Sequence, residues 1–188
     1  GFWFLDTQIL APESDGGEYH DMTGHISKYI GDWKLEKKKH WEWLEKSLKK
    51  NQNIMYKFIF GHFPVVSSGA YIGRDGMEPI IKLMDDYDVT AYISGHDHNA
   101  QHAMILRDGF WVNQFICGAT IDHGTYEEEN AEHNIGVREH IYPTFFSDKL
   151  SFLKFDIDEK KEECTVSFVS DKGKEMYNYV LEYAEREK

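Results

Sequence analysis

The chain has 188 residues, of which 41% are apolar and 15% aromatic, which is enough to bury a core and argues against disorder. Its 21 Lys and Arg against 33 Asp and Glu give a net charge of −12 without a basic stripe, so we expect no nucleic-acid partner. No apolar run approaches the roughly 18 residues that a membrane helix needs, and we expect no membrane-spanning helix.

Apolar strands and charged helices alternate over the first half of the chain. Short apolar runs that end at glycine, proline or a polar loop predict strands over 2–10, 54–60 and 89–94. A polar loop is expected from the first strand to about Asp32. Apolar residues near one face of a charged segment predict a helix over 34–50, and a shorter helix is expected over 77–87. This alternation indicates an α/β or α+β layer architecture.

The second half reads as β-rich. The sequence predicts a hairpin of strands 102–107 and 110–117, a loop to about Ser147, and paired strands 150–157 and 164–169. The last segment, 174–183, fits a strand or a helix, and its alternation favours a strand. Neither Cys117 nor Cys164 lies in a zinc-type CxxC, and the two allow at most one disulfide. No repeat or interior linker divides the chain, so we expect one globular unit.

Three histidines follow the ends of two predicted strands. His62 comes after Gly61 at the end of one strand, and His96 and His98 follow Gly95 at the end of the next. Ligand sites of open α/β sheets gather at the carboxyl ends of strands, so adjacent strand ends would bring these imidazoles together. Imidazole binds zinc, iron and manganese. The pattern favours a metal site over independent hydrogen-bonded loop histidines, and leaves open whether the metal is catalytic or structural.

A longer string around these histidines resembles the purple acid phosphatases, and in particular their small tartrate-resistant type. The resemblance rests on Phe4-Leu5-Asp6-Thr7, on the run Trp41–Leu48 within the predicted helix, on Gly61-His62-Phe63-Pro64-Val65, and on the segment 89–101 with Gly95-His96-Asp97-His98-Asn99. It covers residues 2 to about 119 and thins afterwards.

The resemblance implies a metallophosphoesterase-type β-sandwich flanked by helices, and an acid phosphatase that hydrolyses phosphate monoesters. It implies a binuclear centre of Fe(III) and a divalent zinc, iron or manganese ion. Carried over to this chain, His62 and His96 would bind the divalent ion and His98 the ferric ion, and Asn99 would support the ligands from behind. It also implies a secreted or lysosome-like location.

The chain departs from the family pattern in two ways. Three upstream motifs that would supply the other ligands (an Asp-x-Gly, a Gly-Asp-x-x-Tyr and a Gly-Asn-His) are absent. We therefore expect residues 1–188 to be the C-terminal portion of a single calcineurin-like metallophosphoesterase domain, an incomplete second half with little activity alone. Tyr71 stands where the family usually has a loop histidine, and is either a catalytic donor to phosphate or leaving group, or a surface aromatic.

Two other functions stay open from the sequence. One is a phosphodiesterase or phosphoprotein phosphatase of the same superfamily, and the other is a non-catalytic interaction module with a remnant site. Asp97 is expected to support its loop rather than to bind metal. The remaining histidines and an acidic loop are expected to lie outside the site: His20, His25, His40, His102, His123, Glu127–Glu129, His133 and His140.

Overall fold

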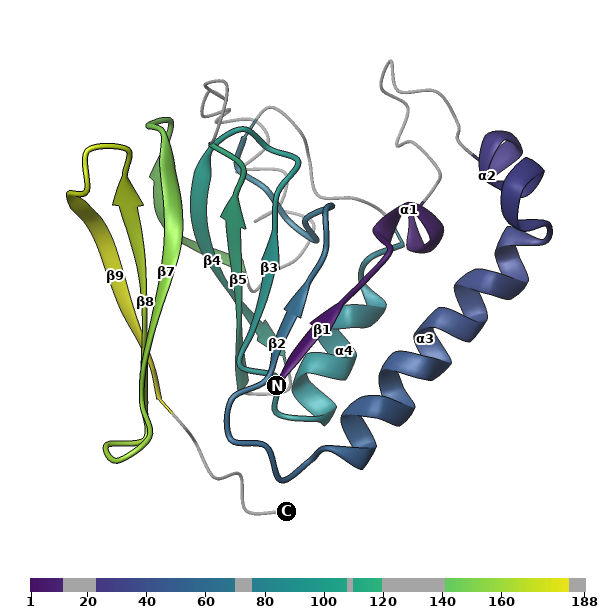
Figure 1. Ribbon diagram of the computed structural model, residues 1–188, viewed down its shortest axis with the longest axis horizontal. Coiled ribbons are helices and arrows are strands. Elements are labelled where there is room, and N and C mark those ends of the chain that lie inside the picture. Colours follow the sequence, from purple (N-terminus) through teal and green to yellow (C-terminus); the bar gives the residue numbers. More distant parts are fainter. Residues whose placement is uncertain (12–22, 70–75, 108–109, 120–140, 183–188) are drawn as a thin grey trace.

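A computed structural model describes residues 1–11, 23–69, 76–107, 110–119 and 141–182, which form two β-sheets and a layer of helices (Figure 1). The elements in chain order are β1 (Phe2–Phe4), α1 (Thr7–Leu10), α2 (Thr23–Ile30), α3 (Trp33–Lys50), β2 (Phe58–Phe60), α4 (Pro79–Asp86), β3 (Ala91–Ser94), β4 (Ala100–Arg107), β5 (Phe110–Cys117), β6 (Ile141–Ser147), β7 (Ser151–Asp158), β8 (Glu163–Ser170) and β9 (Glu175–Glu182).

The larger sheet has six strands in the order β1-β2-β3-β5-β4-β6. β1, β2, β3 and β5 run parallel to one another, while β4 is antiparallel to both β5 and β6. β2 and β3 are direct neighbours, with Phe58 opposite Ala91 and Phe60 opposite Ile93. The segments that follow β2 and β3 therefore emerge side by side at one edge of the sheet.

Both faces of this sheet are buried. On one face, α3 contributes Leu44 and Leu48 to a core that also contains Ile80 of α4 and Ile59 of the sheet. The three-stranded sheet β7-β8-β9 covers the other face, where Phe168 and other buried residues of β8 pack with residues of β2, β3 and β5. Burial on two faces explains the continuous apolar character of β2 and β3. The β-sandwich flanked by helices is thus confirmed.

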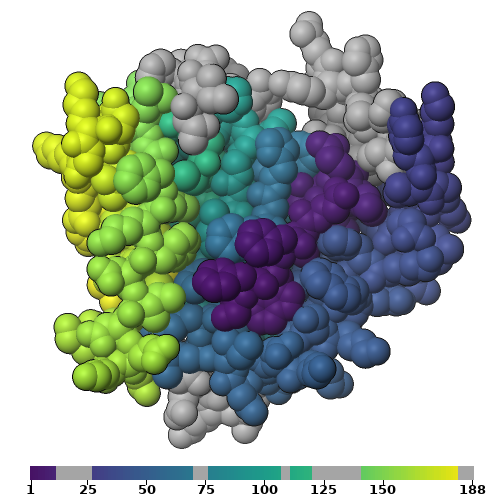
Figure 2. All heavy atoms as spheres, in the orientation of Figure 1, coloured from purple at the N-terminus to yellow at the C-terminus, as the bar shows by residue number. Residues whose placement is uncertain are grey.

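β1 is an edge strand with aromatic side chains at the surface. Phe2 is 61% exposed and Phe4 is 70% exposed, and β1 lies at the surface in the space-filling view (purple in Figure 2). The ring of Phe4 stacks on that of Phe60 at 5.0 Å between centroids. Trp3 points the other way into the core, as the alternation along a strand requires.

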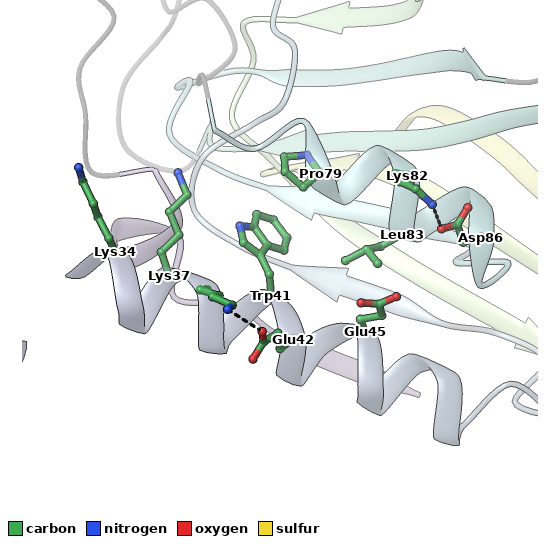
Figure 3. Close-up of a pocket in the computed structure, with 10 residues that line it drawn as sticks. Lys34, Lys37, Trp41, Glu42, Glu45, Pro79, Lys82, Leu83 and Asp86 are labelled. Carbon is green, nitrogen blue, oxygen red and sulfur yellow. Dashed lines mark hydrogen bonds and ion pairs between the residues drawn. The ribbon is translucent and has the colours of Figure 1, made fainter. Parts of the chain in front are cut away.

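A groove of about 520 Å³ separates α3 from α4 on the helical side of the molecule (Figure 3). Trp41 and Leu83 provide its apolar lining, and its rim carries the exposed ion pairs Lys38–Glu42 and Lys82–Asp86. Exposed pairs of this kind contribute little to stability. The groove belongs to the helix layer and does not include the strand ends that carry the histidines.

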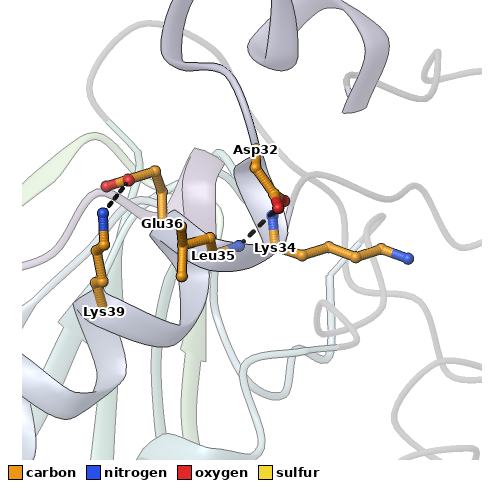
Figure 4. Close-up of polar contacts among 5 residues, drawn as sticks. All are labelled: Asp32, Lys34, Leu35, Glu36 and Lys39. Carbon is orange, nitrogen blue, oxygen red and sulfur yellow. Dashed lines mark hydrogen bonds and ion pairs between the residues drawn. The ribbon is translucent and has the colours of Figure 1, made fainter.

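The start of α3 is set by Asp32. Its Oδ1 accepts hydrogen bonds from the backbone N–H groups of Lys34, at 3.1 Å, and Leu35, at 3.2 Å (Figure 4). These donors have no partner within the helix, so the aspartate satisfies them. One turn further, Lys39 donates to Glu36 at 2.7 Å. The helix predicted over 34–50 is confirmed, with its start one residue earlier.

Three predictions of local structure were wrong. The strand predicted over 2–10 ends at Phe4, because the Asp6 carboxylate caps the N–H groups of Gln8 and Ile9 and starts the short helix α1. α2 and β6 occupy segments that were predicted as loops.

The strand over 174–183 is confirmed as β9, and both cysteines are free thiols. No helix among the described ranges is both long and apolar enough to cross a membrane.

Candidate metal site

The site is built on the turns that follow β2 and β3. The N–H of Gly61 donates to the carbonyl of Ile93 at 3.0 Å, and the N–H of Gly95 donates to the carbonyl of His62 at 3.0 Å. These bonds continue the β2–β3 ladder for one residue beyond each strand. They hold the backbone of His62 beside that of Gly95, directly before His96.

The imidazoles of His62 and His96 lie against each other. Nδ1 of His96 is 3.2 Å from Nε2 of His62, and the ring planes meet at 76° with centroids 5.1 Å apart. Two nitrogens that share one ion at about 2.0–2.1 Å are about 2.8–3.4 Å apart in tetrahedral or octahedral geometry. The observed spacing therefore fits two ligands of one metal ion, as well as a shared proton.

His96 has an unusual backbone conformation. Its φ is +67°, in the left-handed region that residues other than glycine rarely adopt. This conformation costs roughly 1 kcal/mol and is held only where the surroundings impose it. Here the side chain packs edge-on against Phe63, with ring centroids 4.8 Å apart. In this conformation the imidazole of His96 lies against His62 and Phe63 of the β2 turn.

Thr7 and Tyr92 hold the backbone of the β2 turn. Thr7 Oγ1 accepts hydrogen bonds from the N–H groups of His62, at 3.1 Å, and Phe63, at 3.3 Å. The Tyr92 hydroxyl donates to the carbonyl of Phe63 at 2.5 Å. A Cβ at Gly61 would lie 2.6 Å from Thr7 Cγ2, so only glycine fits there. The turn that presents His62 is therefore tied to α1 and to β3.

A buried polar network lies beneath the two turns. The Ser67 hydroxyl donates to the Asp97 carboxylate, and Gln101 Nε2 donates to Ser67 Oγ at 2.8 Å and to Asn99 Oδ1 at 2.7 Å. Asp97 and Asn99 are fully buried. Asp97 thus supports the loop, as expected from the sequence. Burial of this network is tolerable because most of its groups are hydrogen-bonded.

Asn99 Nδ2 is the exception in this network. It is buried and has no hydrogen-bond partner among the described residues, although its carboxamide oxygen is satisfied. A buried donor without an acceptor is costly and marks a position where an absent group can bind. Asn99 can therefore donate a hydrogen bond to an acceptor at this edge of the sheet.

The predicted site residues have different positions. His62 and His96 come together, and His62 and His98 are both exposed. The described residues contain no group of three or more His, Cys, Asp or Glu side chains that could hold an ion. Tyr71 lies outside the described residues. So do His20, His123, Glu127–Glu129, His133 and His140, and of His25 only the backbone is described.

His102 lies between the two sheets. Its Nε2 is 3.0 Å from Asn113 Oδ1 and its Nδ1 is 2.8 Å from the Tyr177 hydroxyl, so Nε2 donates and Nδ1 accepts. The ring stacks on Phe115 at 4.2 Å. Burial lowers the pKa of His102 to about 4, and the hydrogen bond to Asn113 offsets only part of this effect. His102 is a neutral core residue and has no place among the site histidines.

Sequence reasoning missed the residues that position the site. Thr7 was read as part of a strand, and Gln101 was read as part of a family motif without a positioning role. Gln114 was also missed, although its Oε1 accepts from the N–H groups of Val65, at 2.8 Å, and Val66, at 3.2 Å. A polar residue within an apolar strand, as Gln114 is, was the available signal, since buried polar side chains need specific partners.

Comparison with known proteins identifies a family and relatives of the chain. Residues 3–100, just over half of the chain, match the family model described as calcineurin-like phosphoesterase. Tartrate-resistant acid phosphatase type 5 of Mus musculus is 26% identical over 95% of the chain and 51% of its own length, and that of Homo sapiens is 27% identical over 93% and 50%. The chain thus spans about half the length of these relatives.

Two solved structures share the fold. One, titled "GAP50 the anchor in the inner membrane complex of Plasmodium", has a TM-score of 0.68 at 23% identity, over 99% of this chain and 50% of its own. The other is the purple acid phosphatase PPD1 from yellow lupin (Lupinus luteus) seeds, with a TM-score of 0.57 at 14% identity over 75% of this chain and 28% of its own. At these identities the likeness concerns the fold alone.

Proposed function

Because the chain belongs to the calcineurin-like phosphoesterase family, we propose that it is part of a metal-dependent acid phosphatase that hydrolyses phosphate monoesters. One observation carries this proposal: the 3.2 Å approach of His62 Nε2 and His96 Nδ1 at adjacent strand ends. The acid phosphatase relatives support the choice of reaction within the family.

We propose the metal ligands from the geometry of the two turns, together with the resemblance to acid phosphatases. His62 and His96 would hold one divalent ion, zinc, iron or manganese, and His98 would hold a second, ferric ion, as in the acid phosphatases that the sequence resembles. Asn99 supports the centre by donating from its unpartnered Nδ2. Such a pair of cations stabilises the charge on a phosphoryl group and activates water for attack on phosphorus.

The protein's own residues orient the reaction. The bonds from Thr7 and Tyr92 hold the His62 turn, and the strained His96 backbone fixes the second imidazole, so the donor atoms are placed before metal arrives. We propose Tyr71 as a donor to a phosphate oxygen or to the leaving group. Its ordinary pKa near 10 keeps a phenol protonated at acidic pH, which suits a donor and not a base.

The rest of the centre is assigned to parts of the protein beyond residues 1–188. The chain spans about half the length of its acid phosphatase relatives. Among its described residues, no carboxylate joins His62 and His96 to form a group of three metal ligands. We propose that residues 1–188 are the C-terminal portion of one phosphoesterase domain. Carboxylates from the other portion would complete the coordination and neutralise the ions, and we expect residues 1–188 alone to hydrolyse little phosphate.

A non-catalytic role is the second candidate. It is favoured by the absence of a three-membered metal-ligand group from the described ranges, and by the structural neighbour whose title names it an anchor. In this alternative the chain keeps the fold and the histidine pair but serves as an attachment surface.

The two candidates differ in metal content and turnover. We expect the full-length protein to contain about two metal ions per chain and to hydrolyse p-nitrophenyl phosphate. His62→Ala with His96→Ala should abolish both, whereas His40→Ala, which removes a histidine of α3, should change neither. A metal-free full-length protein without phosphatase activity would contradict the enzyme proposal and favour the attachment role.

A further inference from the structure

A second cleft lies between the two sheets at the end of the molecule that carries the site. It has a volume of about 800 Å³ and lies between the turn from β6 to β7 and the turn from β8 to β9. Its lining combines apolar side chains with lysines: Phe145, Phe146, Met176, Lys149, Lys172 and Lys174. The ring of Phe145 stacks on Tyr177 at 4.5 Å and on Phe168 at 5.3 Å, so the apolar floor is held rigidly.

The strand register places this cleft beside the proposed metal site. Ser147, which lines the cleft, is paired with Ala100, the first residue of β4, and His98 precedes Ala100 by two residues. Two Cα steps and one strand spacing put the Cα atoms of His98 and Ser147 within about 13 Å. Both turns of the cleft lie at the same end of the sandwich as the ends of β2 and β3 (Figure 1).

Backbone hydrogen bonds fix the two turns in place. The N–H of Asp171 donates to the carbonyl of Leu150 at 3.1 Å, which ties the β8–β9 turn to the β6–β7 turn. The N–H of Ser151 donates to the carbonyl of Ala119 at 3.0 Å, which ties β7 to the segment after β5. The cleft is therefore formed before any ligand binds.

The charge of the cleft is opposite to that of the chain as a whole. Lys149, Lys172 and Lys174 are exposed and make no ion pair with any described residue. Two acids also line the cleft, Asp171 and Glu175, and three minus two leaves a charge of +1 in a chain of net charge −12. The carboxylate of Glu175 is engaged by Ser167 and Asn178, at 2.9 and 2.6 Å.

We propose that this cleft binds an acidic peptide segment of the phosphorylated substrate, with an apolar residue on the aromatic floor and carboxylates on the lysines. The proposal rests on the proposed phosphatase function for its link to the metal site, and on the cleft alone for peptide binding. An extended peptide advances about 3.3 Å per residue, so a separation of at most about 13 Å is spanned by no more than roughly four residues. The preferred substrate then carries acidic residues within about four positions of the phosphorylated one.

Binding is measured with two fluorescein-labelled peptides of equal length. One has glutamates three and four positions on either side of a central serine and a phenylalanine beside them, and the other has glutamines in place of the glutamates. We expect the acidic peptide to bind about fivefold more tightly at low salt, and the difference to vanish near 1 M NaCl. Lys172→Gln with Lys174→Gln should remove the preference, while the matched change Lys160→Gln with Lys161→Gln, in the β7–β8 turn at the opposite end, should leave it.

The same peptides with phosphoserine separate the two proposals in the full-length protein. If the cleft acts as proposed, the acidic phosphopeptide has a lower KM than the neutral one, Lys172→Gln with Lys174→Gln removes that difference, and kcat and p-nitrophenyl phosphate hydrolysis stay unchanged. Equal binding of the acidic and neutral peptides, or an equal loss in both lysine variants, would overturn the cleft assignment. Peptide preference without any hydrolysis would support the cleft and contradict the phosphatase function.

Discussion

His62 Nε2 and His96 Nδ1 lie 3.2 Å apart although 34 positions separate the two residues. The parallel pairing of β2 with β3 places the two strand ends side by side, and the left-handed backbone of His96 accompanies the contact of its ring with His62. Strand pairing thus brings one imidazole nitrogen from each of two distant Gly-His dipeptides into contact.

Thr7→Val should loosen the site. Valine has nearly the shape of threonine but cannot accept the hydrogen bonds from the N–H groups of His62 and Phe63. The unfolding free energy should fall by about 1–3 kcal/mol, since Phe63 N–H would be buried without a partner. Urea unfolding and zinc titration check both effects. Thr7→Ser, which keeps the hydroxyl, should retain metal affinity, and a Thr7→Val protein with unchanged stability would contradict this role.

Two substitutions at His96 should separate backbone strain from metal binding. His96→Ala removes the imidazole and keeps the strained φ, whereas His96→Gly removes both. We expect His96→Gly to be more stable than His96→Ala by about 1 kcal/mol, with metal affinity lost equally in both. Denaturant melts and metal titrations give the two readouts. Equal stability of the two variants would show that this backbone is not strained.

His102 should make stability depend on pH. Burial lowers its folded-state pKa to about 4 from an ordinary value of 6.5, so the unfolded chain binds more protons between these values. Stability therefore rises with pH across this window, levels off above it, and falls by roughly 3 kcal/mol as pH drops from 6.5 to 4. Urea midpoints between pH 4 and 8 should show a smaller slope in His102→Gln than in the unsubstituted protein. Identical slopes would exclude His102 as the source.

Asp32→Ala serves as a test of stability away from the site. Loss of the carboxylate leaves the N–H groups of Lys34 and Leu35 without their cap, at a cost of about 1 kcal/mol. Thermal unfolding measures this loss, and Asp32→Asn should recover most of it. Metal affinity should not change in either variant, because α3 covers the sheet through Leu44 and Leu48 and does not supply the site. A parallel loss of metal affinity would show that the helix layer and the site are coupled.

Local patterns predicted most of the elements. The helix α3, the hairpin β4–β5 and the strands β7, β8 and β9 follow from periodicity and turn residues, which act over a few neighbouring positions. The strand predicted over 2–10 failed where Asp6 caps α1, since a local side-chain hydrogen bond outweighed the apolar pattern. β6 was missed because it exists through its pairing with β4, a distant segment.

The amino-acid sequence by itself determined the layer architecture and the position of two Gly-His pairs at strand ends, because burial patterns and turn chemistry are local properties of the chain. Only the tertiary structure decided that β2 and β3 are neighbours, that Thr7 and Tyr92 hold the His62 turn, and that His102 is a neutral core residue. The physical reason is that hydrogen-bond partners and desolvation depend on which distant segments meet. That choice is made by the packing of the whole sheet.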